Sequence, residues 1–398
     1  NGTARKESDA IPPVLPKPTR EAWKSSLGVV DKFPCFDGSR LIRIGPDSLC
    51  LQSLDLTTGK VIWECPFVGK PELDPMLMGD LVVYVNGSYL LTVVDVTIGK
   101  ERFSIQLESL KSFLLSAKKN LPKVLFPVQN ENTLLITIFG KGKGGATGIV
   151  YAIDILSGQK RWEAKIPEGA DLSPVVQEGR VIVGGAGRVI ALDLQTGKQL
   201  WEVLTGANVQ LCDGPLLGKQ LHVVAEGYLL AIDVEKGREE WRTPLTAGTP
   251  PLGDGNRILY TEKRGVFRKS EWIVAHEKET GTKVWEFEVG STKMPGIQDG
   301  KVYCNAYENL ICLDLQTGKT LWKRALDVEP CLPISLAGET AYIATENEGK
   351  QHLYAVKLAD GAVGWDYTFT GKCSSGLLLP MADGLLCPGE EGALIALK

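Results

Sequence analysis

Short apolar, β-branched runs alternate with Gly, Asp and Asn turn residues along most of this chain. In the clearest stretch, 173–193, an apolar run, a Glu-Gly turn, a second apolar run, a Gly turn and a third apolar run follow one another. The chain then continues through a Thr-Gly turn into a fourth run, which contains a Trp. Four short runs joined by tight turns predict a four-stranded antiparallel meander.

An eleven-residue motif, best seen as ALDLQTGKQLW at 191–201, ends each repeat. It has a small residue, an acid two positions later, Gly at position seven and an aromatic residue at position eleven. Eight copies place this Gly 37 to 44 residues apart, with a single interval of 59. A period near forty indicates a solenoid, propeller or array. We expect an all-β, closed β-propeller of four-stranded antiparallel blades, because radial packing buries both faces of each sheet.

The aromatic residues of the motif recur once per blade, which favours a structural role over a ligand platform. We expect each to wedge between neighbouring blades, since a buried Trp removes roughly 150–250 Å² from water. The docking residues are Trp23, Trp63, Phe103, Trp162, Trp201, Trp241, Trp285, Trp322 and Trp365.

The two ends of the chain predict how the ring closes. The C-terminal run GALIALK, 392–398, matches the third strand of a unit and stops before the Gly turn. Near the N-terminus, REAWKS at 20–25 is a Trp strand with no unit before it. We infer that the N-terminal strand completes the last blade, which gives nine blades; eight is the alternative if one unit is displaced. Residues 20–398 then form a single domain, and the proline-rich 1–19 is a disordered leader or linker.

Composition excludes several classes of protein. A net charge of −4 gives no basic footprint for nucleic acid. No stretch approaches eighteen consecutive apolar residues, so we expect no membrane span, although a lipid or fused anchor before residue 1 is compatible with this start. Nine cysteines include no CxxC pair, and we expect buried free thiols in the strands that carry Cys35, Cys50, Cys304, Cys312 and Cys387.

Candidate chemistry is sparse. The three histidines, His222, His276 and His352, fall in different repeats, which argues against a three-histidine metal site. The run GKGKGGATG at 140–148 lacks the GK[ST] ending of a phosphate loop and is interpreted as a hairpin loop. The motif aspartates precede tight turns, where they accept N–H groups more readily than they bind calcium; they are Asp55, Asp154, Asp193, Asp233 and Asp314.

The motif A-x-D-x-x-T-G-x-x-x-W resembles that of the pyrroloquinoline-quinone (PQQ) repeat family over about residues 20–398. The resemblance rests on ALDLQTGKQLW, AIDVEKGREEW, AIDILSGQKRW and CLDLQTGKTLW. It implies docking of each Trp against the small residue and Gly of a neighbouring motif. The departures are Ser53, Val93 and Cys312 for Ala, Lys357 for Asp, and Phe103 for Trp, and they suggest looser docking.

That family contains quinoprotein dehydrogenases, which bind PQQ and calcium in the funnel and carry adjacent cysteines and a catalytic Asp. It also contains non-catalytic propellers, similar to the lipoprotein of the bacterial outer-membrane barrel-assembly machinery. This chain has no Cys-Cys pair and no recognisable cofactor residue, so it resembles the second kind. The resemblance implies work outside the bacterial cytoplasm.

Four insertions decorate one face of the predicted ring, the face of the 2–3 turns and the blade links, which we call the insert-bearing face. They are 104–122, 139–148, 262–271 and 345–351. The first predicts an amphipathic helix with Leu107, Leu110 and Leu114 on one side. The second carries Lys141 and Lys143, and the third carries an Arg–aromatic cluster: Arg264, Phe267, Arg268, Lys269 and Trp272. These are the candidate partner-binding residues, because exposed Arg and aromatic residues form hot spots; a solvated hairpin with inward aromatics is the alternative.

The combined prediction is a monomeric, non-enzymatic propeller without catalytic, metal or cofactor residues. It binds a protein or polymer on the insert-bearing face. The alternative is a quinoprotein-like dehydrogenase that binds PQQ and calcium in the central funnel.

Overall fold

The computed structural model describes most of the chain, in ranges separated by short gaps. The described ranges are 14–26, 35–36, 39–45, 49–66, 74–86, 89–107, 123–125, 127–142, 145–167, 173–185, 187–206, 209–211, 219–225, 227–245, 252–265, 270–290, 295–326, 328–370, 378–381, 384–389 and 393–398.

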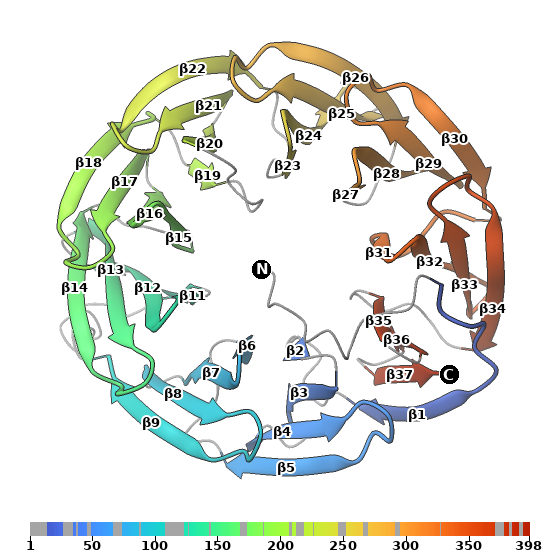
Figure 1. Ribbon diagram of the computed structural model, residues 1–398, viewed down its shortest axis with the longest axis horizontal. Helices are drawn as coiled ribbons and strands as arrows, with labels where there is room; N and C mark the ends of the chain where they lie inside the picture. The colour runs from blue at the N-terminus through green and yellow to red at the C-terminus, as the bar shows by residue number, and fades with distance from the viewer. Residues whose placement is uncertain are drawn as a thin grey trace.

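Within these ranges the strands form nine antiparallel sheets, which are the blades of a β-propeller (Figure 1). Blades 1 to 3 consist of β2 (Cys35–Phe36), β3 (Arg40–Ile44), β4 (Cys50–Asp55), β5 (Val61–Pro66); β6 (Met76–Met78), β7 (Leu81–Val85), β8 (Leu90–Asp95), β9 (Glu101–Gln106); and β10 (Lys123–Val124), β11 (Val128–Asn130), β12 (Thr133–Gly142), β13 (Gly145–Asp154), β14 (Lys160–Pro167). Blades 4 to 6 consist of β15 (Val175–Gln177), β16 (Arg180–Gly185), β17 (Arg188–Asp193), β18 (Gln199–Leu204); β19 (Val209–Leu211), β20 (Gln220–Ala225), β21 (Tyr228–Asp233), β22 (Arg238–Pro244); and β23 (Leu252–Asp254), β24 (Arg257–Arg264), β25 (Ser270–Glu277), β26 (Lys283–Gly290). Blades 7 to 9 consist of β27 (Gly296–Gln298), β28 (Lys301–Ala306), β29 (Asn309–Asp314), β30 (Thr320–Ala325); β31 (Ser335–Ala337), β32 (Thr340–Asn347), β33 (Lys350–Lys357), β34 (Val363–Thr370); and β35 (Leu379–Met381), β36 (Gly384–Pro388), β37 (Ala393–Leu397) with β1 (Glu21–Ser26).

Each blade runs from a short inner strand at the channel to an outer strand at the rim (Figure 1). The middle strands are buried on both faces, because each blade is covered by its two neighbours. The apolar clusters accordingly combine residues of adjacent blades: Ile182 and Ala191 of blade 4 pack with Leu221 and Val223 of blade 5. We call such an interface between two blades a seam.

The predicted closure of the ring is confirmed. β1 pairs antiparallel with β37, and Trp23 lies opposite Ala396. Leu15, which precedes the predicted domain start at residue 20, is fully buried, and its N–H donates a 3.0 Å hydrogen bond to the hydroxyl of Tyr342. The N–H of Thr19 donates to the carbonyl of Lys398, just as Gly59 donates to Asp55 in blade 1. The two chain ends therefore rebuild a motif turn together.

The docking residues follow a common geometry across the seams. Trp201 of blade 4 lies so close to Gly237 of blade 5 that a Cβ there would be 2.2 Å from the indole, and its Nε1–H donates to the carbonyl of Val234, 2.8 Å away. Seven indoles make such a bond, those of Trp23, Trp63, Trp162, Trp201, Trp285, Trp322 and Trp365. Phe103 packs on Gly158 in the same way without an N–H to donate.

The motif aspartates cap their turns as expected. In blade 4, Oδ1 of Asp193 accepts hydrogen bonds from the N–H and hydroxyl of Thr196 at 2.7 Å. The same capping occurs at Asp55, Asp154, Asp233 and Asp314. Where the residue before the docking aromatic is Arg, it adds an ion pair, as Arg161 does to Asp154 at 2.5 Å.

The amphipathic helix and the buried cysteines are the remaining structural predictions. Leu107 is buried, but most of the predicted helix lies at 108–122, outside the described residues. Cys304, Cys312 and Cys387 are buried free thiols as predicted, whereas Cys35 and Cys50 are half-buried. Burial raises the pKa of Cys304 to about 12, which makes it unreactive.

Candidate functional site

The insert-bearing face carries the irregular parts of an otherwise regular ring. The two strands of the blade 3 hairpin, β12 and β13, are 10 residues long each. The corresponding strands of blades 6 and 8 are 8 residues long. In blade 4 and blade 7 the same strands have only 6 residues. The insertions at 139–148, 262–271 and 345–351 therefore lengthen β-hairpins, as the sequence predicted.

Few of the predicted binding residues lie within the described ranges. Lys143, Phe267, Arg268 and Lys269 lie outside the described residues, and Lys141 is described only as a residue of β12. Arg264 and Trp272 come together at the base of the blade 6 hairpin: the guanidinium carbon lies 4.7 Å from the centre of the indole ring.

Carboxylates hold Arg264 in place. Its Nε donates to Glu262, which is 5% exposed, and its second terminal nitrogen donates to Glu286 at 2.9 Å. Lys283 also pairs with Glu286, at 3.0 Å, and these two cations lower the pKa of Glu286 to about 2. Arg264 is thus paired with carboxylates of β24 and β26 within its own blade.

Trp272 is half-buried and contributes to the seam between blades 5 and 6, where it packs with Tyr260 and Val274. Its Nε1–H donates a 2.9 Å hydrogen bond to the hydroxyl of Ser270. The indole thus packs into the seam at the base of the blade 6 hairpin.

Sequence reasoning missed the acidic partners, although a signal existed. Glu262 and Arg264 are two positions apart on one strand and therefore lie on one face of the sheet. A second aromatic–Arg pair was also missed: Arg242 lies 5.3 Å from the ring centre of Tyr228, which is 40% exposed, in blade 5. Its signal is weak, because the two residues are far apart in sequence and meet across β21 and β22.

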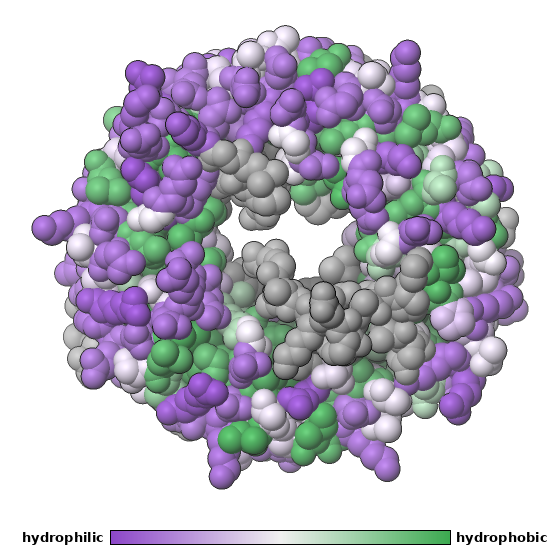
Figure 2. Space-filling model, viewed as in Figure 1, coloured by the Kyte–Doolittle hydropathy of each residue, from purple (hydrophilic) through white to green (hydrophobic). Residues whose placement is uncertain are grey.

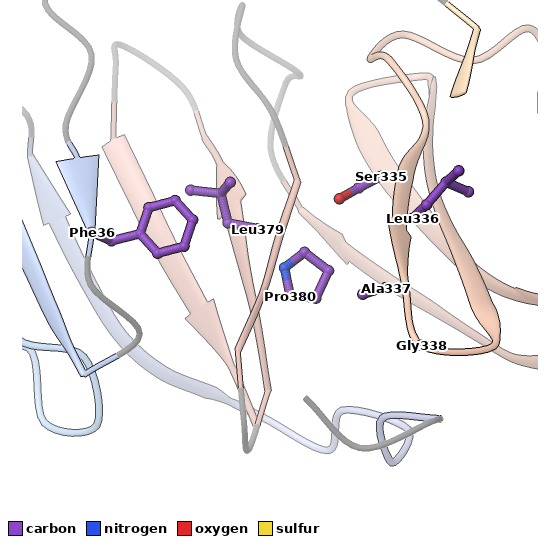
Figure 3. Close-up of a pocket in the computed structure, with 7 residues that line it drawn as sticks. All are labelled: Phe36, Ser335, Leu336, Ala337, Gly338, Leu379 and Pro380. Atoms are coloured by element: carbon purple, nitrogen blue, oxygen red, sulfur yellow. The ribbon is translucent and has the colours of Figure 1, made fainter. Parts of the chain in front are cut away.

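A recess of about 370 Å³ opens in the wall of the channel. It lies among the inner strands of blades 8, 9 and 1 (Figure 3). Phe36 points toward Leu379, whereas Pro380 points to the other side, toward Ser335 and Ala337 (Figure 3). The opening of the channel itself is visible in the space-filling view, and hydrophilic residues predominate toward the outer rim of this face (Figure 2).

The lining of this recess does not fit PQQ and calcium. PQQ carries several carboxylates that need cationic partners, and calcium takes roughly six to eight oxygen ligands. Ser335 supplies the polar side chain among Phe36, Leu336, Ala337, Leu379 and Pro380. Across the described ranges, no group of three or more His, Cys, Asp or Glu side chains is arranged to hold a metal ion.

Comparison with known proteins agrees with this architecture. The PQQ-repeat family described as outer membrane protein assembly factor BamB matches residues 15–168, 117–250, 146–367 and 269–397. The chain belongs to this family. Outer membrane protein assembly factor BamB of Yersinia pestis is 24% identical over 276 residues, which are 64% of this chain and 56% of that protein. The match thus spans a little over half of that relative.

Solved structures show the same fold at low sequence identity. BamB from Moraxella catarrhalis is 16% identical, with a TM-score of 0.52 and coverage of 97% of this chain and 100% of that one. Quinohemoprotein alcohol dehydrogenase from Comamonas testosteroni is 14% identical, with a TM-score of 0.54 and coverage of 90% and 78%. The BamB family therefore shares its fold with enzymes. The described ranges contain no apolar helix of membrane-spanning length.

Proposed function

We propose that this protein is a monomeric, non-enzymatic scaffold that binds a protein or polymer partner on its insert-bearing face. The observation that carries the proposal is the lengthening of three hairpins on that one face, in blades 3, 6 and 8. Variable loops on a rigid scaffold are where binding residues concentrate.

Family membership supports a protein as the partner. The family is described as an outer membrane protein assembly factor, and an assembly factor works by contact with other proteins. We therefore place the activity outside the bacterial cytoplasm, with proteins of outer-membrane assembly as the partner class.

Within this proposal the hairpin residues have two roles. Lys141, Lys143, Phe267, Arg268 and Lys269 supply contacts at the hairpin ends. Arg264 and Trp272 stiffen the base of the blade 6 hairpin, since Arg264 is already paired with Glu262 and Glu286. Such pre-organisation lowers the entropy cost of binding.

Affinity capture from a detergent-solubilised bacterial envelope tests the proposal. The tagged wild-type chain is compared with a double variant, Arg268→Glu with Lys269→Glu. We expect the variant to lose the captured proteins while its melting temperature is unchanged. The matched control, Lys198→Glu with Lys319→Glu, reverses two charges at 3–4 turns on the opposite face. Capture that is lost only in the control would reject the proposed face.

A quinoprotein-like dehydrogenase is the second candidate, because the Comamonas enzyme has the same fold. Addition of PQQ and calcium would then change the visible absorbance and produce dye-linked alcohol oxidation. We expect neither, because the side chains that line the channel recess include no cation for the carboxylates of PQQ and no carboxylate for calcium.

A further inference from the structure

The seam between blades 5 and 6 departs from the docking geometry of the other seams. Trp241 packs on Gly281, but its buried Nε1–H has no hydrogen-bond partner among the described residues. Its expected acceptor, by analogy with the other seams, is the carbonyl of Lys278. That carbonyl instead lies 3.2 Å from Nε2 of His222, whose ring centre is 5.6 Å from that of the Trp241 indole, with the two rings tilted by 40°. A histidine has therefore replaced an indole in the bond that joins two blades.

The motif itself is altered at the same place. The residue that supplies the acceptor carbonyl is Leu56, Val96, Leu194, Val234, Leu315 or Leu358 in other blades, whereas here it is Lys278. The carboxylate of Glu277, which stands in place of the usual Asp, accepts from the hydroxyl of Thr280. This seam thus combines an unusual motif with an unusual bond.

A second histidine faces the same seam from blade 6. Nδ1 of His276 lies 2.8 Å from the carbonyl of Gly281, so the Nδ1–H donates there. The other ring nitrogen, Nε2, then accepts from the hydroxyl of Tyr260, 3.2 Å away. Both histidines are 3% exposed, and both contacts suit a neutral imidazole.

Tyr260 links this pair of histidines to the base of the blade 6 hairpin. Tyr260, Glu262 and Arg264 alternate along β24 and therefore share one face of the sheet. Tyr260 and Trp272 belong to one apolar cluster with Trp241 of blade 5. One continuous set of contacts thus joins the docking turn on one face of the ring to the hairpin on the other.

Burial is the main factor that opposes protonation of the two histidines. The pKa of His222 is lowered to about 4, mainly by burial; the hydrogen bond to the Lys278 carbonyl opposes this shift and the nearby Lys278 ammonium adds to it. Burial also lowers the pKa of His276, helped by Lys283 and opposed by the Gly281 hydrogen bond and by Glu262. From blade 5, Glu240 accepts a 2.6 Å hydrogen bond from the side-chain amide of Gln220, which also lies 3.5 Å from the carbonyl of Glu279 in blade 6. Protonation therefore places uncompensated charge in a buried interface.

We propose that the seam between blades 5 and 6 is an acid-responsive joint, in which protonation of His222 and His276 loosens the contact between the blades and the base of the hairpin that carries Arg264 and Trp272. The joint would regulate the partner surface, and this last step rests on the proposed function. The protonation and the loosening are properties of the chain alone.

Indole N–H signals in ¹H–¹⁵N NMR spectra test the joint without any partner. Trp→Phe variants assign the signals of Trp241 and Trp272. In the wild type we expect both signals to shift together as the pH falls from 7.5, with a midpoint between 4 and 6.5. In the double variant His222→Gln with His276→Gln, the amide groups still donate to the carbonyls but do not titrate, so we expect the shift to vanish.

The third histidine provides the matched control. His352 lies in blade 8, where its Nδ1 contacts the hydroxyl of Thr368 at 2.9 Å. His352→Gln is expected to leave the titration of Trp241 and Trp272 unchanged. The proposal is overturned if the two indole signals stay fixed, or if they move equally in the double variant. Should the double variant fail to fold, the imidazole signals of the wild type decide: ordinary titration of His222 near 6.5 overturns the proposal.

Because these measurements need no partner, they separate failure of the joint from failure of the proposed function. If the indole signals titrate as expected but the protein captures no envelope proteins, only the partner-binding function is rejected.

Discussion

The indole of Trp365 donates a 2.7 Å hydrogen bond to the carbonyl of Leu15, which precedes it by 350 residues. Trp365 and Leu15 also belong to one apolar cluster with Tyr342. The first described residues therefore act as the missing motif turn of blade 9. Closure of the ring depends on this short segment as well as on the pairing of β1 with β37.

Leu15→Ala tests this role. Truncation of a fully buried Leu costs about 2–5 kcal/mol, so we expect the free energy of unfolding to fall by that amount in denaturant melts. Val14→Ala is the control, since Val14 is 40% exposed and should change stability by less than about 0.5 kcal/mol. Equal effects of the two variants would contradict the role of Leu15 in closure.

Trp201→Phe and Trp241→Phe separate the hydrogen bond of a docking residue from its packing. Trp201→Phe loses the bond to Val234, whereas Trp241 has no such bond among the described residues to lose. We expect Trp201→Phe to be more destabilising by about 1 kcal/mol, the usual net value of a hydrogen bond. Chemical denaturation measures the difference, and the opposite order would show that the indole N–H is irrelevant to docking.

Gly237→Ala and Gly79→Ala separate turn strain from blade packing. Both glycines have positive φ, 62° and 58°, so each Ala pays roughly 1–2 kcal/mol of backbone strain. A Cβ at Gly237 also meets Trp201 at 2.2 Å, whereas nothing lies within 4 Å at Gly79. We expect Gly237→Ala to cost about 1–3 kcal/mol more, as overpacking does. Thermal melts that coincide would rule out tight docking at Gly237.

Trp272→Ala tests whether this residue supports the fold. The half-buried indole lies under the guanidinium of Arg264 and packs on Tyr260. Its removal should lower the free energy of unfolding by roughly 1–3 kcal/mol. A fully exposed ligand platform would cost less than about 0.5 kcal/mol. Denaturant melts distinguish the two, and Trp272→Phe should recover most of the loss.

His222 predicts a dependence of stability on pH. Its pKa in the folded chain, about 4, lies below the unfolded value of 6.5. Between these values the unfolded state binds more protons, so stability is complete above pH 6.5 and is lost as the pH falls toward 4. Once the pH has fallen to the folded pKa, the free energy of unfolding is lower by about 3 kcal/mol than above pH 6.5.

Urea melts at pH 7.5 and pH 4.5 measure this loss, and His222→Gln should flatten the pH dependence by a similar amount. Parallel curves for the wild type and the variant would mean that His222 titrates alike in both states.

The sequence alone determined the features that repeat. The period near forty residues, the motif Gly and the capping aspartates specify each blade locally, because strand alternation, a positive φ and a turn hydrogen bond depend on residues close in the chain. The closing strand was also predictable. The C-terminal run GALIALK ends before the Gly turn and the Trp strand of its repeat, and REAWKS near the N-terminus is a Trp strand with no unit before it.

Tertiary structure decided what lies between the blades. In the sequence, Leu15 belongs to the proline-rich segment that predicts a leader. Its burial becomes evident only in the folded chain, where Trp365 and Tyr342 surround it. His222 and His276 belong to different repeats, yet they face a single seam because adjacent blades present opposite faces to each other. The repeat period describes a single blade. Contacts across a seam depend on which individual side chains meet there. The packing of the two sheets determines those contacts, and the sequence of neither blade does so alone.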